Sequence, residues 1–358
     1  MNLSELSRLR LLRQQVETSS SGSVRELMGR MGAMQAQDYA MSKWAVGCRV
    51  PGSKIEEVES ALNSGEILRT HLLRPTWHLV SSNDIHWLLE LTAPRIKSQL
   101  KTRNRQLELS AEILNKSNDL IVNSLEGGKS FNRDELVSLF ENAGIKTDLN
   151  RASHLLMHAE MEGILCSGPE KNRKITYALL SERVSHKPGF NREEALQKLA
   201  TVYFTSRGPA SLRDFAWWSG LTGRDAAAAL QMAKPKLTSL AFGTETYWFS
   251  GTIPENTKQS DQVFLLPAFD EFLLSYTDRK ASVPALNFRK AVYSNGIFRP
   301  LIILGGQVVG IWKRNLKKDQ ILIETSFFTS KSELIPEKLE DAAQLFAGFL
   351  GKQAEVLM

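Results

Sequence analysis

Two glutamines one residue apart, Gln35 and Gln37, are followed directly by Asp38 at a point where a helical segment is expected to end. In an extended or turning backbone, side chains two positions apart point to the same side. Gln35 and Gln37 would therefore present two amide groups to one place, with Asp38 facing elsewhere. A pair of amides can hold a water molecule or a sugar oxygen through donor and acceptor contacts. The same letters are also typical of a polar loop after a helix, and their spacing alone leaves both interpretations open.

Other catalytic or metal-binding patterns in the chain are weaker. Gly127-Gly128-Lys129-Ser130 resembles the tail of a phosphate-binding P-loop, but Asn123 stands where that motif requires glycine. His154 and His158 have helical spacing without a third ligand, so we expect both to be structural. No Ser/His/Asp or Cys/His set has a recognisable spacing, which leaves covalent acyl chemistry without support. The sequence predicts neither a metal site nor a cofactor.

Two short apolar runs, Ile67 to Leu73 and Thr76 to Val80, flank the turn signal Arg74-Pro75 and predict a β-hairpin. If Arg74-Pro75 is the turn, positions that sum to 149 face each other, which pairs His71 with His78. A role of these histidines at DNA or at a site is one interpretation, and packing within the hairpin is the other.

The order of helices followed by a hairpin recurs along the chain and is typical of a winged helix. We expect winged helices at residues 1–106, which carry the Gln-x-Gln motif, at 107–187 and at 188–250, followed by a β-rich basic region at 251–358. The predicted fold class is α+β, with three tandem winged-helix domains, a β-rich C-terminal region and a closing helix.

Within the C-terminal region we expect strands at Ala291 to Tyr293, Arg299 to Leu304 and Gln307 to Trp312, and a helix from about Pro336 to Leu350 closing the chain. Asn295-Gly296 and Gly305-Gly306 are typical two-residue hairpin turns. The polar tract Ser250 to Gln262 is expected to be a linker.

Positive charge is concentrated late in the chain. The net charge is +6, and the window from Arg279 to Lys318 holds nine Lys and Arg residues and no Asp or Glu, which leaves the rest of the chain at −3. Such a window indicates a polyanion partner, although a solvated surface is the alternative. A smaller acid-free run from Arg95 to Arg105 fits either interpretation. The two cysteines, Cys48 and Cys166, are far apart and favour a reducing cytoplasm.

Two pairs of adjacent residues, one aromatic and one acidic, could belong either to the core or to a functional site. Trp217 and Trp218 are expected in the core rather than as stacking platforms. Asp270 and Glu271 could form a paired-carboxylate site, but sequential carboxylates usually diverge, so we expect Asp270 to join Asp278 and Arg279 in a structural ion network.

Four stretches carry a resemblance to a known family: Met34-Gln35-Ala36-Gln37-Asp38, Leu73 to Val80, Leu266 to Arg279, and Ser294 to Pro300 with Gly310-Ile311-Trp312. They resemble the AlkZ-like winged-helix DNA glycosylases, which excise alkylated or crosslinked bases. The resemblance implies three winged helices around a concave basic surface and a catalytic Gln-x-Gln signature, which Gln35 and Gln37 fit. That branch of the family is associated with bulky N7-alkylguanine adducts and interstrand crosslinks. Pro75 departs from the glycine expected there and removes an amide donor.

The resemblance implies that Gln37 holds the attacking water and Gln35 supports the sugar or Gln37, with Asp38 as a reserve base. No lysine adjoins the motif to form a Schiff base, so we expect a monofunctional enzyme that leaves an abasic site. The residues expected to bind DNA are Arg69, Arg74, Trp77, His78, Arg279, Lys280, Arg289, Lys290, Arg299, Lys313 and Arg314.

The partner implied is double-stranded DNA carrying alkylated bases, bound by a monomer in the cytoplasm, associated with the nucleoid and not with a membrane. The main alternative is a winged-helix DNA-binding or regulatory protein without catalysis. A protein that handles RNA or nucleotides ranks below both.

Overall fold

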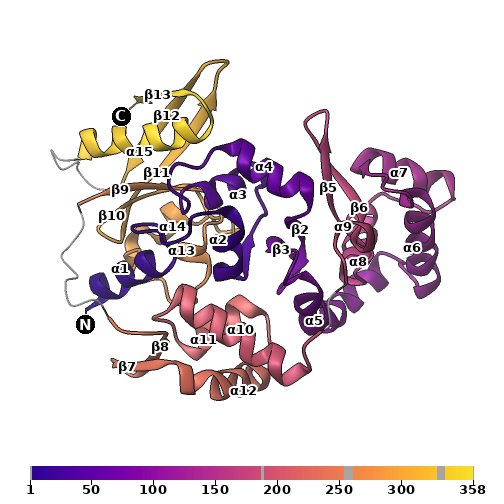
Figure 1. Ribbon diagram of the computed structural model, residues 1–358, viewed down its shortest axis with the longest axis horizontal. Helices are drawn as coiled ribbons and strands as arrows, with labels where there is room; N and C mark the ends of the chain where they lie inside the picture. Colours follow the sequence, from indigo (N-terminus) through magenta and orange to yellow (C-terminus); the bar gives the residue numbers. More distant parts are fainter. Residues whose placement is uncertain (1, 187–188, 254–260, 329–334, 358) are drawn as a thin grey trace.

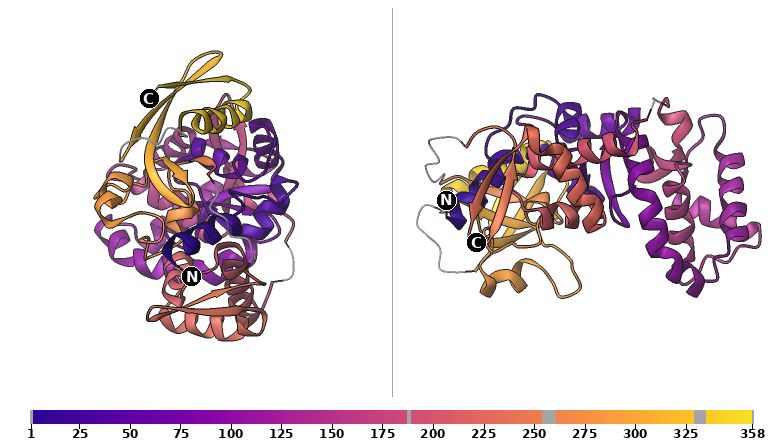
Figure 2. Two further views of the ribbon diagram at one scale, coloured as in Figure 1. Left: turned by 90° about the vertical axis from the view of Figure 1, so that its left-hand side faces the viewer. Right: turned by 90° about the horizontal axis from the view of Figure 1, so that it is seen from below.

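The computed structural model describes residues 2–186, 189–253, 261–328 and 335–357 (Figure 1). Much of the expected linker, Ser250 to Gln262, therefore lies outside the described residues. None of the described helices is both long and apolar enough to cross a membrane. The second repeated unit, described below, lies at one end of an elongated molecule, and both termini lie near the other end (Figures 1 and 2).

After a first helix, α1 (Leu3–Arg13), the chain forms a first unit whose elements are α2 (Val24–Met31), β1 (Ala33–Gln35), α3 (Tyr39–Gly47), α4 (Ile55–Ser64), β2 (Ile67–Leu72) and β3 (Thr76–Ser81). Its sheet has the order β1-β3-β2. Local sequence sets these boundaries. Ser23 caps α2 by accepting from the Glu26 N–H, and Gly32 ends it with a positive φ of 70°. Asp38 caps α3, which turns the chain sharply just after the glutamine pair.

A long helix, α5 (Ile85–Gln106), leads to a second unit with the same order of elements: α6 (Ala111–Leu125), β4 (Phe131–Asn132), α7 (Arg133–Asn142), α8 (Arg151–Met161), β5 (Leu165–Lys171) and β6 (Lys174–Leu179). Its sheet order is β4-β6-β5, the same arrangement as in the first unit. A single turn, α9 (Leu180–Arg183), follows.

A third unit contains α10 (Arg192–Arg207), α11 (Leu212–Ser219), α12 (Gly223–Ala233), the 3₁₀ turn η1 (Lys234–Lys236), β7 (Thr238–Phe242) and β8 (Glu245–Phe249). The position of its first strand is taken by one bridge between Ala210 and Trp248.

The C-terminal region comprises β9 (Val263–Leu266), α13 (Glu271–Leu274), α14 (Ala285–Ala291), β10 (Leu301–Leu304), β11 (Gln307–Leu316), β12 (Gln320–Phe327), α15 (Ile335–Phe349) and β13 (Gln353–Leu357). Its five strands have the order β13-β12-β11-β10-β9. The turn at Gly305-Gly306 is confirmed between β10 and β11.

Two expectations for this region were wrong. Ala291 ends helix α14, and beyond it only Val292 makes a single bridge, to Phe298, so residues 291–293 are not a strand. Helix α15 does not close the chain, because β13 follows it and pairs in parallel with β12. The connection through α15 makes that parallel pairing possible.

The expected register of the β2–β3 hairpin was also wrong. The connecting loop has three residues, with Leu73 in the left-handed region at a φ of 58°, so His71 faces Trp77 and Thr70 faces His78. Because neighbouring side chains alternate between faces, this shift of one residue places His71 and His78 on opposite sides of the sheet. His71 pairs with the buried carboxylate of Glu160 on α8.

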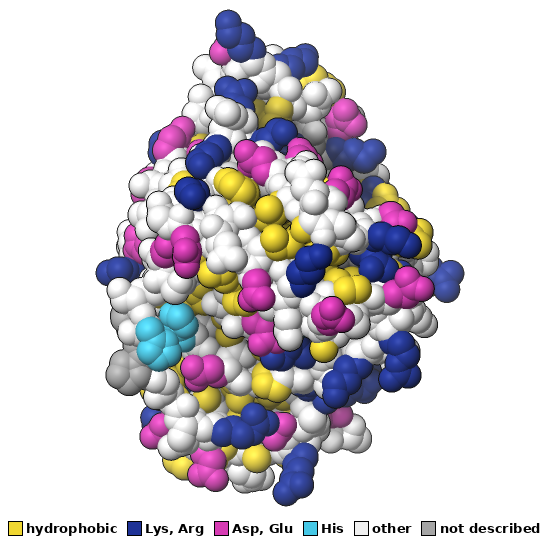
Figure 3. Space-filling model, turned by 90° about the vertical axis from the view of Figure 1, so that its right-hand side faces the viewer, with side chains coloured by type: hydrophobic (Ala, Val, Ile, Leu, Met, Phe, Trp, Pro, Cys, Tyr) yellow, Lys and Arg dark blue, Asp and Glu magenta, His cyan; other side chains and the backbone are white. Residues whose placement is uncertain are grey.

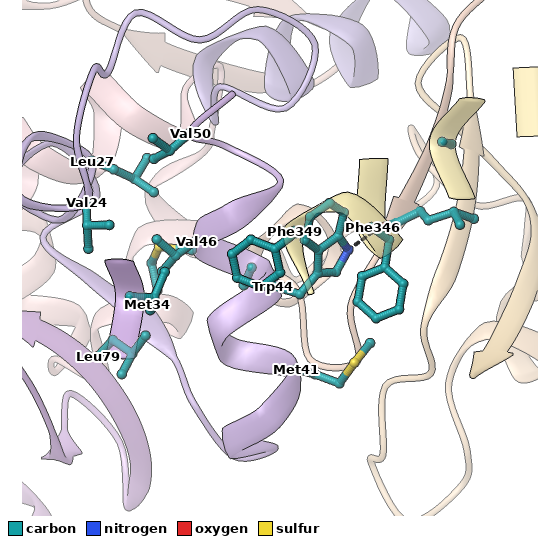
Figure 4. Packing of buried hydrophobic residues seen from close by; sticks show 14 of the residues in the cluster. Val24, Leu27, Met34, Met41, Trp44, Val46, Val50, Leu79, Phe346 and Phe349 are labelled. Atoms are coloured by element: carbon teal, nitrogen blue, oxygen red, sulfur yellow. Dashed lines mark hydrogen bonds between the residues drawn. The ribbon is translucent and has the colours of Figure 1, made fainter. Parts of the chain in front are cut away.

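The hydrophobic cores are distributed unequally. The second unit has its own core, made only of residues from Leu107 to Leu179. The first unit instead shares one core with the C-terminal sheet and α15, and a second core with the third unit. Trp44 of α3 shows this sharing, because its ring centroid lies 5.1 Å from that of Phe346 and 5.3 Å from that of Phe349 (Figure 4). Its indole N–H donates to the Leu265 carbonyl at 2.7 Å.

Candidate active site

Three hydrogen bonds fix the backbone at the start of the Gln-x-Gln motif. The Gln35 N–H donates to the Glu271 carboxylate at 2.8 Å. The Ala36 N–H donates to the Trp77 carbonyl at 2.7 Å, and the Ala36 carbonyl accepts from Arg69 Nε at 3.0 Å. Since β1, β2, β3 and α13 all contribute, the position of the motif depends on segments far apart in the chain.

Glu271 is the anchor of this arrangement, and its side chain is almost completely buried. Its second oxygen accepts from Arg207 Nε at 2.9 Å, from the Ser275 hydroxyl at 2.7 Å and from the Trp218 indole at 3.0 Å. Burial alone would raise the pKa of this carboxyl, but the Arg207 charge and the hydrogen bond from the Gln35 N–H outweigh burial and lower it to about 2. Glu271 is therefore an anion at neutral pH.

Arg207 extends this anchor along β1. Its two terminal nitrogens donate to the Met31 carbonyl at 2.8 Å and to the Ala33 carbonyl at 2.6 Å. Sequence reasoning missed Arg207, because nothing around this residue at the end of α10 marks a link to β1. Glu271 was noted only as one half of a carboxylate pair, and the acidic doublet was the sole signal available.

The two glutamines differ in exposure. Gln35 is only 7 % exposed, and its side-chain oxygen accepts from Arg74 Nη2 at 3.3 Å. Gln37, two residues later at a bend, is exposed to solvent. Asp38 accepts from the Met41 N–H at 3.0 Å, so its carboxylate caps α3. The site thus combines the Gln35 amide, which is hydrogen-bonded to Arg74, the solvent-exposed amide of Gln37, and the Asp38 carboxylate, which caps α3.

Arg314 of β11 brings the basic C-terminal sheet to this motif. Its pKa is lowered by burial and raised in part by the nearby carboxylate of Asp38. Lys313, its neighbour on β11, is exposed. Arg314, a member of the long basic window, therefore lies within electrostatic range of Asp38, although the two residues are 276 positions apart in the sequence.

Two of the residues expected to bind DNA, Arg69 and His78, lie inside the protein. Arg69 stacks on Trp77 with its guanidinium carbon 4.2 Å from the ring centroid. His78 is fully buried, and its Nδ1–H donates to the Thr76 carbonyl at 2.9 Å in the neutral tautomer that this contact favours. Burial and the Arg74 charge lower the pKa of His78 to about 3, so the ring is neutral at physiological pH. A DNA contact by either residue stays a prediction.

Trp217 and Trp218 have different environments. Trp218 is buried as expected, but Trp217 is 43 % exposed, so the expectation of a core position for Trp217 was wrong. Its indole N–H donates to the Leu274 carbonyl at 3.0 Å, which fixes the ring beside Arg74. Gly220, the residue after α11, allows the β2–β3 hairpin loop to lie close to the end of this helix. It has a φ of +68°, and a Cβ there would lie 2.1 Å from the Leu73 carbonyl oxygen in the hairpin loop.

The expected ion network of Asp270 with Asp278 and Arg279 was wrong, because Asp270 pairs with a different residue. Asp270 forms a fully buried ion pair with Arg49 at 2.8 Å. Arg279 instead donates its Nε–H to the Leu273 carbonyl at 2.8 Å, and burial together with the Arg74 charge lowers its pKa to about 10. Asp278 accepts from the Lys280 N–H at 2.9 Å.

The remaining predicted DNA-binding residues line the C-terminal region with varied exposure. Lys280, Arg289, Lys290 and Lys313 are exposed, whereas Arg299 and Arg314 are half-buried. Arg299 lies over the ring of Tyr293, with its guanidinium carbon 5.0 Å from the centroid.

The other sequence motifs have local partners. His154 contacts Asn104 at 2.9 Å, and His158 lies 3.3 Å from the Glu162 carboxylate. The N–H groups of Gly127 and Gly128 donate to Glu182. In the part of the chain that the structure describes, no group of three His, Cys, Asp or Glu residues is arranged to hold a metal ion. On the end face of the molecule beyond the second unit, positive and negative side chains are intermixed (Figure 3).

Repeated helix–strand units, a C-terminal sheet whose strand β11 carries Lys313 and Arg314, and a glutamine pair of which Gln35 is held by Arg74 characterise this class of protein. The chain belongs to the family described as DNA glycosylase AlkZ-like, which it matches over residues 28–349. Proteins of that name are enzymes that hydrolyse N-glycosyl bonds in DNA.

Two comparisons with Streptomyces sahachiroi proteins agree with this assignment. The chain is 24 % identical to an interstrand DNA cross-link repair glycosylase, over 92 % of this chain and 91 % of that protein. It superposes on the solved structure of the DNA glycosylase AlkZ with a TM-score of 0.79 at 20 % identity, covering all of both chains. The second comparison shows that the two share a mixed α/β fold.

Proposed function

We propose that this protein is a monofunctional DNA glycosylase that hydrolyses the N-glycosidic bond of N7-alkylguanine, including bulky adducts and interstrand crosslinks. The observation that carries the proposal is the glutamine pair. Three hydrogen bonds hold the backbone of Gln35 and Ala36, while the next residue, Gln37, is exposed to solvent. The crosslink-repair name of the Streptomyces relative supports the lesion class.

The chemistry suits an amide. Alkylation at N7 makes guanine a cationic leaving group, so its departure requires little acid catalysis. The oxygen of a water molecule bonds to the sugar C1′ as the C1′–N9 bond breaks, the bonding electrons leave with the base, and the surplus proton passes to solvent. Gln37 orients that water through its carbonyl oxygen, and Gln35 supports the sugar or Gln37. The rate enhancement then comes from placement and preorganised dipoles.

We propose further that the three repeated units are winged helices, at residues 1–106, 107–187 and 188–250, with residues 251–358 as the β-rich basic region. The shared order of helix, strand, two helices and two strands supports this assignment, as does the matching strand order of the first two sheets. The β2–β3 and β5–β6 hairpins would be the wings.

The proposed partner is duplex DNA with alkylated bases, bound by a monomer in the nucleoid. Four exposed cations would contact phosphates: Lys280, Arg289, Lys290 and Lys313. Half-buried Arg299 and Arg314 would bind closer to the motif. Bulky crosslinks cannot enter a closed base pocket, which favours an open basic surface such as this one.

A base-release panel tests the proposed function. The protein would be incubated with otherwise identical duplexes that are unmodified, contain N7-methylguanine or carry a nitrogen-mustard crosslink, and free bases would be measured by mass spectrometry. We expect release from both alkylated duplexes and an intact strand that breaks only after heat or alkali. If the duplexes bind and no base is released, the protein is a non-catalytic DNA binder. Strand breakage without heat or alkali would exclude a monofunctional enzyme.

A further inference from the structure

A cavity of about 770 Å³ opens beside the candidate active site, and the proposed function uses only Arg289 among its lining residues. Its walls include one exposed ring on α11, one arginine before α14 and several residues on and after α14: Trp217, Arg279, Phe288, Arg289, Tyr293 and Phe298. Its volume falls within the range of about 300–1,000 Å³ that is typical of small-ligand sites. We name it the aromatic cavity.

The aromatic cavity combines ring faces with positive charge. The guanidinium carbon of Arg279 lies 5.8 Å from the Trp217 ring centroid and 5.1 Å from that of Phe298. On the same indole, the guanidinium carbon of Arg74 lies 5.1 Å from the centroid. Two cations therefore flank one partly exposed ring.

Neither of these two cations is directly ion-paired within the described part of the chain, although the charge of Glu271 near Arg74 and the charges of Asp214 and Asp278 near Arg279 oppose part of the effect of burial on their pKa values. Among the described residues, neither Arg74 nor Arg279 forms an ion pair with a carboxylate, and Arg74 Nε is buried without a hydrogen-bond acceptor. Burial lowers the pKa of both side chains, and the charge of Arg74 lowers that of Arg279 further. An anion placed between them would relieve this repulsion.

The position of the cavity relates it to the glutamine motif. Arg74 donates to the Gln35 side-chain oxygen at 3.3 Å, so one side chain separates the motif from the Trp217 ring. Trp217 is held by its hydrogen bond to Leu274, and Tyr293 on the opposite segment is 49 % exposed. Two partly exposed rings thus line the aromatic cavity, and the Arg299 guanidinium carbon lies 5.0 Å from the centroid of the Tyr293 ring.

We propose that the aromatic cavity binds one unstacked nucleotide of the DNA near the lesion, with its base against Trp217 and Tyr293 and its phosphate at Arg279 and Arg289. This inference rests on the proposed function in taking DNA as the polymer. Rings that accept any base face, together with cations that hold the backbone, are the combination used for unpaired nucleotides. A base within a regular duplex offers no free face, so the nucleotide must leave the stack.

Equilibrium binding of two undamaged duplexes tests the proposal by fluorescence anisotropy. One is fully paired, and the other has the same sequence with a single unpaired adenine. We expect the protein to bind the bulged duplex roughly 5- to 150-fold more tightly, the range that base–aromatic stacking provides. Trp217→Leu and Tyr293→Ala should reduce this preference severalfold and leave the affinity for the paired duplex within about twofold.

Phe190→Ala is the matched control. Phe190 is a 42 % exposed ring with the Lys198 ammonium 4.6 Å from its centroid, but it lies outside the aromatic cavity. Its substitution should leave the preference for the bulged duplex unchanged. Thermal melting followed by circular dichroism would show that each variant folds, and Tyr293→Ala decides the question if Trp217→Leu does not fold.

Equal affinity of the unsubstituted protein for both duplexes would overturn the proposal, as would a preference that both cavity variants retain. If the protein binds only a duplex with an aromatic adduct more tightly than the paired duplex, the cavity binds the adduct and the proposal is contradicted. Because no step requires base release, the outcome is separate from that of the glycosylase assay. If the protein prefers the bulged duplex but releases no base, the proposed nucleotide site is supported and the proposed glycosylase activity is contradicted.

Discussion

The first and second units have the same order of elements and the same strand order, yet only the first carries the candidate active site. In each, a glutamate accepts a backbone N–H near the end of the first strand. In the second unit, Glu135 accepts from the Asn132 N–H at 2.6 Å, three residues away and exposed. In the first, Glu271 accepts from the Gln35 N–H at 2.8 Å, is buried and comes from 236 residues away.

This difference shows how the same arrangement of helices and strands serves as a structural scaffold in the second unit and carries the candidate active site in the first. The second unit has a core of its own and a local capping box at the strand end. The first unit divides its hydrophobic residues between two shared cores, so side chains from α10, α11 and α13 reach its strand end. The chemistry of the site therefore depends on long-range packing rather than on the repeated fold.

The largest expected effect is that of removing the buried anchor. Glu271→Ala leaves Arg207 without its partner, and we expect it to lower the free energy of unfolding by about 3–5 kcal/mol. Glu135→Ala removes only the exposed cap and should cost about 1 kcal/mol or less. Urea denaturation measures both. Equal losses would contradict the distinction between a long-range anchor and a local cap.

Acid should weaken the same anchor. The folded-state pKa of Glu271 is about 2, below its ordinary value of 4.5, so its contribution is complete above pH 4.5 and is lost as the pH falls towards 2. At about 1.4 kcal/mol per pKa unit, that contribution is about 3 kcal/mol. The buried neutral His78, whose pKa is lowered from 6.5 to about 3, adds a loss that begins below pH 6.5.

Unfolding free energies measured from pH 7 to pH 3 check this dependence. Glu271→Gln, which keeps the shape of the side chain without the charge, should flatten the part of the profile below pH 4.5. A profile that Glu271→Gln leaves unchanged would show that another carboxyl group accounts for the acid sensitivity.

A smaller effect is expected for single surface cations. Lys313→Ala on β11 should reduce the slope of log affinity for duplex DNA against log salt by about one. In the second unit, Lys174 is paired with Asp134 at 3.2 Å, so Lys174→Ala should change the slope less. Anisotropy titrations between 50 and 200 mM salt measure both variants. A larger loss for Lys174→Ala would move the main phosphate contacts to the second unit.

Local sequence predicted most helices and strands, because capping residues and turn glycines act over a few positions. Gly305-Gly306 marks a real turn between β10 and β11, whereas Asp38 was considered only as a reserve base although it caps α3. The hairpin register could not be obtained in this way. The letters Leu73-Arg74-Pro75 allow a loop of either two or three residues, and only the left-handed conformation of Leu73 separates these possibilities.

The candidate site was predictable only in part. The Gln-x-Gln motif is visible in the sequence, but its anchor joins Gln35 to Glu271 and Arg207 through tertiary packing, which leaves no local pattern. The sequence also did not reveal which of the two neighbouring tryptophan side chains is exposed to solvent. Trp217 and Trp218 are adjacent letters, yet the turn of α11 buries one ring and leaves the other at the cavity.

The central claim is that Gln37 orients the water that displaces an alkylated guanine. Its most direct test is the single-turnover rate of N7-methylguanine release by Gln37→Ala, with duplex affinity measured alongside. Since Gln37 is exposed and the backbone before it is held independently, the variant should fold and bind normally. We predict a rate about 100-fold lower at unchanged affinity. A rate equal to that of the unsubstituted protein would contradict the claim.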